Sequence, residues 1–514
     1  MKKTTIILIT LLINSVYTNA QPTLQWQKAL GGTGEESANS IIQTADGGYI
    51  VAGNTLSTDG NVTGNHGGED YWVVKLSSTG TIQWQKTLGG SNDDIAKGIV
   101  QTADGGYVVA GYSGSNDGDV TGNHGEYDYW IVKLNSTGVI QWQKSLGGIE
   151  NDIANGVTQT ADGGLLICGI TYSYDGDITL NNGYGDCWIV KLNSAGVLQW
   201  QKSIGGTDSD EGMSIKQTAD GGIIVAATTF SNDFDVSGNH GEWDFWVAKL
   251  NATGTIQWQN TLGGTLEDEA ATVIQTNDGG YAVVGTVLTT TPNTGNIVGA
   301  HGDNDYWVVK LNSAGVLQWQ KPLGGTSYDY GFGVVETIDG GLVVAGSSQS
   351  TNGNSDLSND MNGNYWLVKL NSAGAIQWQK NYGGTEFDRA HCIIKTADNG
   401  LAVAGFAFSN NEDVSGNHGE SDYWIVKLSA DPLGTADFNN NEIKLYPNPV
   451  SDVLQIQEMN EPITAIKIID LTGKTVLQQS TNTQMVNVEM LSNGMYVLEV
   501  YSAMGKCAYK FVKQ

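Results

Sequence analysis

The sequence is short of arginine, of cysteine and of positive charge, and each shortage excludes something. A single arginine, Arg389, occurs in 514 residues, so a function built on an arginine cluster is excluded. Asp and Glu number 54 against 25 Lys and Arg, a net charge of −29 that disfavours nucleic acid and anionic membranes as partners. The four cysteines, Cys168, Cys187, Cys392 and Cys507, are too few for a disulfide framework. We expect small buried thiols, with a Cys168–Cys187 disulfide as the alternative.

Long apolar runs are also scarce. At the amino terminus Lys2 and Lys3 precede an apolar stretch over residues 5–13, and small residues end at Ala20. This stretch is shorter than the roughly 20 apolar residues of a spanning helix, so residues 1–20 are predicted to be a secretory signal peptide. No later segment is long and apolar enough to span a bilayer. We therefore expect an exported chain that begins at Gln21, with no transmembrane segment.

What the sequence has in abundance is one unit repeated seven times. Two series of tryptophans and one series of DGG or DNG turns recur at steps of 58 to 61 residues. The tryptophans inside QWQ are Trp26, Trp84, Trp142, Trp200, Trp258, Trp319 and Trp378. Those before VVKL or its variants are Trp72, Trp130, Trp188, Trp246, Trp307, Trp366 and Trp424. A fixed period of this length is typical of propellers, solenoids and arrays of small domains.

Each unit contains four strand-like runs separated by turn signals. In the second copy the runs cover residues 95–102, 107–113, 129–134 and 139–146. Ala103-Asp104-Gly105-Gly106 and Asn135-Ser136-Thr137-Gly138 predict tight hairpin turns, in which glycine supplies the positive φ. No run has the period of a helix. Each unit is therefore predicted to be a four-stranded antiparallel sheet with its tryptophans in the core.

The order of the strands predicts how the units close. The last copy ends at Leu428 without a QWQ strand, and a spare QWQ strand at residues 23–30 follows the leader. If this strand completes the last sheet, every sheet has four strands and the ring is closed. We therefore predict an all-β protein with a seven-bladed β-propeller over residues 21–429. The small-residue strands would line the channel and the QWQ strands would lie outermost.

The units resemble the bacterial β-propeller repeat family whose pattern is GGxxxD, a small-residue strand, DGG and VxG. Here this reads LGGSNDD over residues 88–94 and DGGYVVAG over residues 104–111, and the match covers most of residues 22–429. The resemblance implies the fold but no common activity. The turn at residues 102–106 is also similar to the Asp-box of sialidase-type propellers. The sialidase site needs several arginines, so one arginine excludes that activity.

Beyond the ring the chemistry changes. Residues 430–441 are polar, contain Pro and Gly, and are predicted to be a linker. Residues 442–514 resemble the type A C-terminal sorting domain of the type IX secretion system of Bacteroidetes. The resemblance implies a small Ig-like β-sandwich, recognition by that machinery, and release or retention at the outer cell surface. The matching motif residues are Tyr446, Pro447, Asn448, Pro449, Gly473, Lys474, Gly494 and Tyr496.

Long loops on one face of the propeller are where a ligand is expected. Trp243 lies outside both tryptophan series at a position where another copy has Tyr127, and such aromatics could stack on a sugar. A packing role is the alternative. Four loop carboxylates belong to oxygen-rich turns that would suit Ca²⁺, although solvated turns explain them as well. They are Asp117, Asp119, Asp175 and Asp177.

Two acids recur in almost every unit. The first precedes the innermost strand, at Glu36, Asp94, Asp152, Asp210, Asp268, Asp329 and Asp388. These seven carboxylates could attract a cation at the channel mouth, or each could accept backbone N–H bonds within its own loop. The second precedes the YW strand and is predicted to link neighbouring blades, at Asp70, Asp128, Asp186, Asp244, Asp305 and Asp422, with Asn364 once. His391, beside Arg389 and Cys392, is off the pattern and is interpreted as local packing.

No nucleophile elbow, zinc-protease motif, P-loop or dinucleotide fingerprint occurs in a supporting context, and no catalytic residue is assigned. We therefore predict a monomeric, secreted or surface-attached binding or adhesion protein that recognises glycan or cell-surface material. A glycoside hydrolase on the same propeller is the first alternative, because two suitably spaced carboxylates would suffice. A purely structural adhesin is the second. Departures from the repeat are expected to distinguish them, since a catalytic acid should break the pattern.

Overall fold

The computed structural model describes residues 21–288, 294–354, 362–430, 444–457, 463–470, 474–480, 484–502 and 505–514. The predicted signal peptide and almost all of the predicted linker lie outside these residues. Two compact units emerge, one over residues 21–430 and one at the carboxyl terminus. Each is described by itself.

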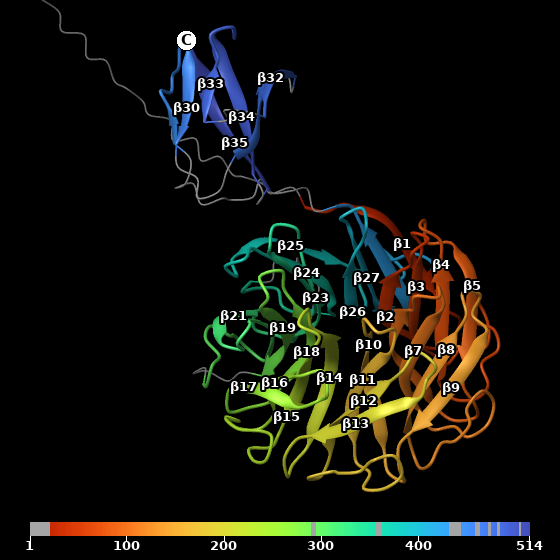
Figure 1. Ribbon diagram of the computed structural model, residues 1–514. Coiled ribbons are helices and arrows are strands. Elements are labelled where there is room, and N and C mark those ends of the chain that lie inside the picture. Colours follow the sequence, from red (N-terminus) through yellow and green to blue (C-terminus); the bar gives the residue numbers. More distant parts are fainter. Residues whose placement is uncertain are drawn as a thin grey trace, which may run out of the picture. The chain divides into compact units, whose positions relative to one another are not determined.

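The larger unit is all-β and consists, in its described residues, of seven four-stranded antiparallel sheets arranged in a ring (Figure 1). The innermost strands are β2 (Glu36–Gln43), β6 (Asp94–Gln101), β10 (Asp152–Gln159), β14 (Asp210–Gln217), β18 (Asp268–Gln275), β22 (Asp329–Glu336) and β26 (Asp388–Lys395). The second strands are β3 (Tyr49–Thr55), β7 (Tyr107–Ser113), β11 (Leu165–Thr171), β15 (Ile223–Thr229), β19 (Tyr281–Leu288), β23 (Leu342–Ser348) and β27 (Leu401–Ala407).

The two outer positions of each sheet complete the blade. The third strands are β4 (Asp70–Leu76), β8 (Asp128–Leu134), β12 (Asp186–Leu192), β16 (Asp244–Leu250), β20 (Asn304–Leu311), β24 (Asn364–Leu370) and β28 (Asp422–Leu428). The outermost strands are β5 (Ile82–Leu88), β9 (Ile140–Leu146), β13 (Leu198–Ile204), β17 (Ile256–Leu262), β21 (Leu317–Leu323), β25 (Ile376–Tyr382) and β1 (Leu24–Leu30). The sequence prediction of a propeller is confirmed.

The ring closes through its first strand. β1 pairs antiparallel with β28, with Gln27 opposite Val426 and Ala29 opposite Trp424, so the last sheet has the order β1-β28-β27-β26. Trp424 donates its indole N–H to Gln27 Oε1 at 3.0 Å, the bond that the equivalent pair makes within a continuous blade. The spare QWQ strand at the amino terminus therefore completes the last sheet, as the sequence predicted.

Both tryptophan series are structural. The seven on the third strands are fully buried, and burying each stabilises the fold by about 1.5–3 kcal/mol or more. The ring centroids of Trp130 and of Tyr71 in the preceding blade are 4.6 Å apart. The Tyr71 hydroxyl donates to the backbone carbonyl oxygen of Trp130. The QWQ tryptophans are mostly half-buried. Trp84 is covered by Gly138 of the next blade, where an added Cβ would approach the indole ring to 3.0 Å.

Cys168 and Cys187 lie on the adjacent strands β11 and β12 but are free. Both are fully buried among apolar side chains, and burial raises the pKa of each thiol. The preferred prediction of small buried thiols therefore holds over the alternative disulfide.

A lysine that the sequence analysis overlooked locks each DGG turn. In the second blade Lys133 is buried, and its ammonium donates to Asp104 Oδ1 at 3.0 Å and to the Leu134 carbonyl at 3.1 Å. Asp104 also accepts from the Thr102 hydroxyl and the Gly106 N–H. These bonds, with that of Thr102 first, lower the pKa of Asp104 to about 2. The equivalent pairs are Lys75–Asp46, Lys191–Asp162, Lys249–Asp220, Lys310–Asp278, Lys369–Asp339 and Lys427–Asp398.

Replacing Asp104 with Ala is expected to destabilise its blade by about 1–3 kcal/mol, because the buried Lys133 ammonium loses its carboxylate. The measurement is thermal unfolding followed by circular dichroism at neutral pH. Thr137→Ala, in the other hairpin turn of the same blade, touches no buried charge and serves as the control. Equal melting temperatures for the two variants would contradict this role of the lysine.

The carboxyl-terminal unit is a small β-sandwich. One sheet has the order β29-β30-β33 and the other the order β32-β31-β34-β35. The strands are β29 (Lys444–Tyr446), β30 (Val453–Gln457), β31 (Ile463–Asp470), β32 (Thr475–Gln479), β33 (Met485–Asn487), β34 (Gly494–Ser502) and β35 (Gly505–Lys513). Leu454, Val486, Ile468 and Leu498 bring both sheets into one core.

The predicted sorting-motif residues gather in part around the last strand. Asn448 accepts from Val512 N–H at 2.9 Å and donates to the Lys510 carbonyl at 3.3 Å, so the segment of Tyr446, Pro447, Asn448 and Pro449 is tied to β35. Tyr496 is buried and stacks on Phe511. Gly494 begins β34, Lys474 lies one residue before β32, and Gly473 falls outside the described residues.

Candidate functional site

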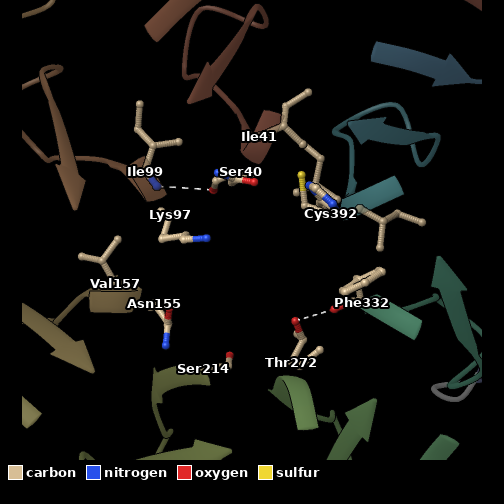
Figure 2. A pocket seen from close by; sticks show the side chains of 18 of the residues that line it. Ser40, Ile41, Lys97, Ile99, Asn155, Val157, Ser214, Thr272, Phe332 and Cys392 are labelled. Atoms are coloured by element: carbon tan, nitrogen blue, oxygen red, sulfur yellow. Dashed lines mark hydrogen bonds between the residues drawn. The ribbon is translucent and has the colours of Figure 1, made fainter. Parts of the chain in front are cut away.

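A channel runs between the seven innermost strands. Its volume is about 520 Å³, and every blade contributes to its wall. Figure 2 shows this wall, with Lys97, Asn155, Thr272 and Phe332 reaching inward from four different blades. The channel is therefore the place where residues of all seven repeats can meet one ligand.

Two rings of side chains face the channel near the end that receives the long loops. The upper ring, formed by the second residue of each innermost strand, is Ser37, Ile95, Ile153, Glu211, Glu269, Tyr330 and Arg389. The middle ring, formed by the fourth residue, is Asn39, Lys97, Asn155, Met213, Ala271, Phe332 and His391. All are half-buried except the exposed Glu269. These rings break the repeat almost at every blade, whereas the core residues keep it.

Aromatic side chains crowd one arc of this mouth, at β22, β26 and β27. We call Tyr328, Tyr330, Phe332, Phe387, Phe406 and Phe408 the aromatic wall. Tyr328 and Tyr330 stack with an interplanar angle of 2°, and the rings of Phe406 and Phe408 meet edge to face. Tyr328 and Phe408 expose about two fifths of their surface, at 43% and 38%. The wall thus offers an accessible apolar surface beside the channel.

The single arginine lies within this wall. The Arg389 guanidinium is 5.0 Å from the ring centres of Tyr330 and Phe387 and 5.4 Å from that of Phe332. Its Nε is buried and has no hydrogen-bond partner among the described residues. Burial lowers the pKa of Arg389, and the tyrosines Tyr330 and Tyr306 oppose this shift.

His391 lines the channel one step below Arg389. Its Nδ1 lies 3.1 Å from the Ala38 carbonyl, and its ring contacts Phe332 and Phe406. Burial first, and then the charges of Arg389 and Lys97, lowers the pKa of His391 to about 3, so the ring is neutral. The local packing predicted for His391 is found, but the residue also belongs to the channel wall.

The other arcs of the mouth carry charge. Lys97 has its pKa lowered by burial and raised by Glu211 and Glu69. Glu211 accepts from the Asn155 amide at 2.9 Å, and burial raises its pKa and that of Glu269. The mouth is therefore asymmetric, with carboxylates on β14 and β18 and the aromatic wall with its arginine on β22 and β26.

The seven predicted channel-mouth carboxylates do not face the channel. All are fully buried, and each accepts the second N–H of the GG pair that precedes its own strand, as Asp94 does from Gly90 at 2.7 Å. The Ser115 hydroxyl donates to the same oxygen of Asp94 at 2.9 Å. These contacts are those of the alternative, in which each carboxylate holds its own loop, and attraction of a cation stays a prediction. The set is Glu36, Asp94, Asp152, Asp210, Asp268, Asp329 and Asp388.

The acid before the YW strand faces the first acid of the next blade. Asp70 accepts from His66 through Oδ2, within its own loop, rather than bonding across to the next blade as a strut would. Its Oδ1 has no hydrogen-bond partner among the described residues and flanks Gly89 together with Asp94 Oδ2. We call these the facing acid pairs. They are Asp70–Asp94, Asp128–Asp152, Asp186–Asp210, Asp244–Asp268, Asp305–Asp329 and Asp422–Glu36.

Trp243 and Tyr127 occupy one repeat position at the rim of the mouth. Both are half-buried, and each leans edge-on against an aromatic of its own blade, Trp243 on Phe230 and Tyr127 on Tyr112. Their carbonyls accept the N–H of Asp268 and Asp152 in the next blade, which ties the blades together. These contacts are those of the packing alternative, and they leave only part of each ring accessible.

The predicted calcium-loop carboxylates also hold loops. Asp117 accepts from Ser91 N–H and Asp175 from Ile149 N–H, while Asp177 accepts from Gly147 N–H at 3.2 Å. Asp119 donates its own backbone N–H to the Gly89 carbonyl. In the part of the chain that the structure describes, no three metal-ligating side chains of His, Cys, Asp or Glu gather.

Sequence reasoning singled out His391 and Arg389 but missed the other residues of the two rings. Their signal was present, because aligning the seven copies shows different residue types at the second and fourth positions of each innermost strand. The sequence prediction selected Trp243 instead, because a tryptophan outside both series is an obvious departure from the repeat. Which departures face one channel becomes visible only once the blades are closed into a ring.

Comparison with known proteins identifies the carboxyl-terminal unit. Residues 444–514 match the family described as the secretion system C-terminal sorting domain. Over 237 residues the chain is 26% identical to the regulatory protein FlaEY of Caulobacter vibrioides, a match that spans 41% of this chain and only 24% of that protein.

Solved structures with a similar fold are distant in sequence. PorZ, an essential surface component of the type IX secretion system of Porphyromonas gingivalis, is 14% identical with a TM-score of 0.41, over 95% of this chain and 60% of that chain. A protein of unknown function from Bacteroides caccae is 16% identical with a TM-score of 0.36, over 60% and 95%. A PL25 ulvan lyase bound to a saccharide is 12% identical with a TM-score of 0.45, over 79% and 96%. Likenesses this distant carry no argument about activity.

The sorting domain determines the route of the protein. A search of the described residues finds no helix with the length and apolar character needed to cross a membrane. The matching family and the seven sheets confirm the sorting domain and the propeller that the sequence predicted. The protein combines a β-propeller with a carboxyl-terminal type IX secretion system sorting domain, which directs it to the cell surface or the medium.

Proposed function

We propose that this protein binds a glycan or other cell-surface material at the upper mouth of its channel, as a secreted or surface-attached, monomeric binding or adhesion protein. One observation carries the proposal: the residues that break the repeat converge there, and six of them form the aromatic wall. The fold does not need them, since other blades have Ser37 or Ile95 at the position of Tyr330. Exposed aromatic faces suit the apolar faces of sugars.

The rim residues extend this proposed site. Trp243 and Tyr127 lie on the same face, and their partly accessible rings would contact the outer part of a long ligand. Asp117, Asp119, Asp175 and Asp177 lie in the surrounding loops, where they would influence charge and loop order rather than stack on a sugar. A Ca²⁺ requirement remains a separate proposal for these loops, tested by binding in the presence of EGTA.

The binding test compares two substitutions that the repeat itself contains. Tyr330→Ile introduces the residue found at position 95 and is expected to weaken binding of a glycan-array hit at least about tenfold, equivalent to about 1.4 kcal/mol. Trp243→Gly introduces the residue found at position 185 and is expected to weaken it less. Isothermal titration calorimetry measures both affinities. If Trp243→Gly abolishes binding while Tyr330→Ile leaves it unchanged, the ligand lies at the rim and not on the wall.

A glycoside hydrolase is the second candidate, and one observation favours it. Glu211 and Glu269 occupy neighbouring positions of the upper ring, break the repeat, and have pKa values raised by burial, as a general acid requires. A reducing-sugar assay on plant and algal polysaccharides tests this candidate. Turnover that disappears in both Glu211→Gln and Glu269→Gln would establish the enzyme and displace the binding proposal.

A further inference from the structure

We infer that the ligand of the channel mouth is an acidic saccharide whose carboxylate or sulfate group pairs with the Arg389 guanidinium. This inference rests on the proposed function and names the class of ligand. Arg389, the only arginine in the chain, has aromatic neighbours on several sides and no acidic partner among the described residues.

Arg389 lacks the partner that a half-buried guanidinium usually has. No ion pair joins it to a carboxylate in the described part of the chain, and its buried Nε has no hydrogen-bond acceptor there. Withdrawing a charge from water without an anion or an acceptor is unfavourable. The cation–π contacts with the three rings offset part of this cost but satisfy none of the N–H donors. The site as it stands is therefore electrostatically incomplete.

The missing partner is an anion that enters from the channel mouth. A guanidinium presents five N–H donors in a planar fork that fits the oxygens of a carboxylate or a sulfate. Tyr330, Phe332 and Phe387 hold that fork without using its donors, because their contacts are made through ring faces. His391 adds no competing charge, since its low pKa keeps it neutral.

The rest of the mouth gives the ligand a direction. Glu211 and Glu269 stand on β14 and β18, away from the arginine, and would repel a negative group. The anionic end of a saccharide would therefore lie at β26, and its apolar sugar face on Tyr328, Tyr330 and Phe408. A ligand that places its anionic group at Arg389 and its sugar face on the aromatic wall would account for a single arginine at this position in a strongly acidic propeller.

The repeat shows that the arginine is not required for folding. The positions equivalent to Arg389 in three other blades are Ser37, Ile95 and Ile153. Arg389→Ile is thus a substitution that the blade accommodates elsewhere, and Ile153→Ser, which introduces the residue found at position 37, is the matched control at the same ring. Circular dichroism melting of both variants checks that each is folded.

The experiment uses pairs of ligands that differ only in charge. Oligogalacturonate is paired with its methyl ester, and sulfated carrageenan oligosaccharide with its desulfated form, and all four are titrated calorimetrically into the full-length protein. We expect the charged member of one pair to bind at least about tenfold more tightly than its neutral form, with a preference that shrinks as NaCl rises. Arg389→Ile should remove that preference, and Ile153→Ser should retain it. The pair that responds separates a carboxylate from a sulfate.

Other outcomes divide the two proposals. Equal binding of charged and neutral ligands, lost in Tyr330→Ile but unchanged in Arg389→Ile, would overturn the acidic class and leave the proposed glycan site intact. A charge preference that persists in Arg389→Ile would overturn the role of the arginine. Failure of every saccharide on a broad glycan array would overturn the proposed function together with this inference.

Discussion

A chain that lacks residues 21–30 is expected to lose cooperative unfolding and to aggregate. The deletion removes β1, so β28 loses its partner and the side of the last blade opens. Trp424, which is fully buried, loses the acceptor for its indole N–H, and the Tyr382 hydroxyl loses the Pro22 carbonyl to which it donates. The total stability of a domain is about 5–15 kcal/mol, and losing a whole strand removes a comparable amount.

Differential scanning calorimetry and limited proteolysis measure this effect. A chain truncated after Ala430 is the control, because it removes only the second compact unit and should keep the melting transition of the propeller. A synthetic peptide with the sequence of residues 21–30, added to the deleted chain, should partly restore the transition. A deleted chain that melts like the full propeller would show that the ring does not depend on this strand.

The second large effect is a fall in stability as pH rises from about 5 to 8. It arises from the facing acid pairs, where two buried carboxyl groups stand against one glycine between blades. Burial, opposed by backbone hydrogen bonds and reinforced by the facing acid, raises the pKa of Asp268 to about 8. The same causes raise the pKa of Asp186 and of Asp305 to about 7. The folded protein thus keeps protons that the unfolded chain releases near pH 4.

The sign follows from this difference in bound protons. Between pH 4 and 8 the folded state binds more protons than the unfolded state, so the free energy of unfolding decreases with rising pH. Each such group contributes a slope of up to about 1.4 kcal/mol per pH unit until pH passes its folded pKa. The turn carboxylates such as Asp104, with a pKa of about 2, lose their contribution below pH 4. Maximum stability is therefore expected near pH 5.

One blade contains its own control for the pH effect. Asn364 takes the place of the aspartate, and its amide nitrogen, turned toward the pair, would donate to Asp388 Oδ2 at 3.2 Å. Asp186→Asn copies this arrangement in a blade where the residue four positions before the acid is Asn182 and not a histidine. This substitution should flatten the dependence of stability on pH and raise the melting temperature at pH 8. Asn364→Asp should steepen the profile. A melting temperature that is level from pH 5 to 8 in the natural chain would contradict the account.

The sequence was sufficient for the fold because the repeat multiplies each weak signal by seven. One QWQ run suggests a strand, but seven of them, with the spare copy placed ahead of the first blade, predict the closed ring. The strand bounds agree within a residue, as at residues 139–146 against Ile140–Leu146. Sorting motifs such as Tyr446-Pro447-Asn448-Pro449 are local in sequence and are equally readable.

The candidate site was less predictable for a physical reason. Arg389 and Tyr330 come together only through the packing of two neighbouring blades, and neither belongs to a motif that has chemistry by itself. For the buried acids the sequence left two interpretations open. The regular spacing of acids such as Asp94 and Asp152 allows a ring of charge at the channel mouth, but each accepts an N–H from the loop before its own strand, as the alternative predicts.

The pairing of β1 with β28, which closes the ring, has a consequence for the lifetime of the protein outside the cell. Gln27 and Trp424 are 397 residues apart, so bringing them together costs on the order of 5 kcal/mol of chain entropy and makes this the latest contact to form. Once this contact has formed, each of the seven described blades packs against a neighbour on both sides, so local unfolding has no free edge from which to spread. Such a ring should assemble slowly and then resist extracellular proteases for far longer than its equilibrium stability alone would suggest.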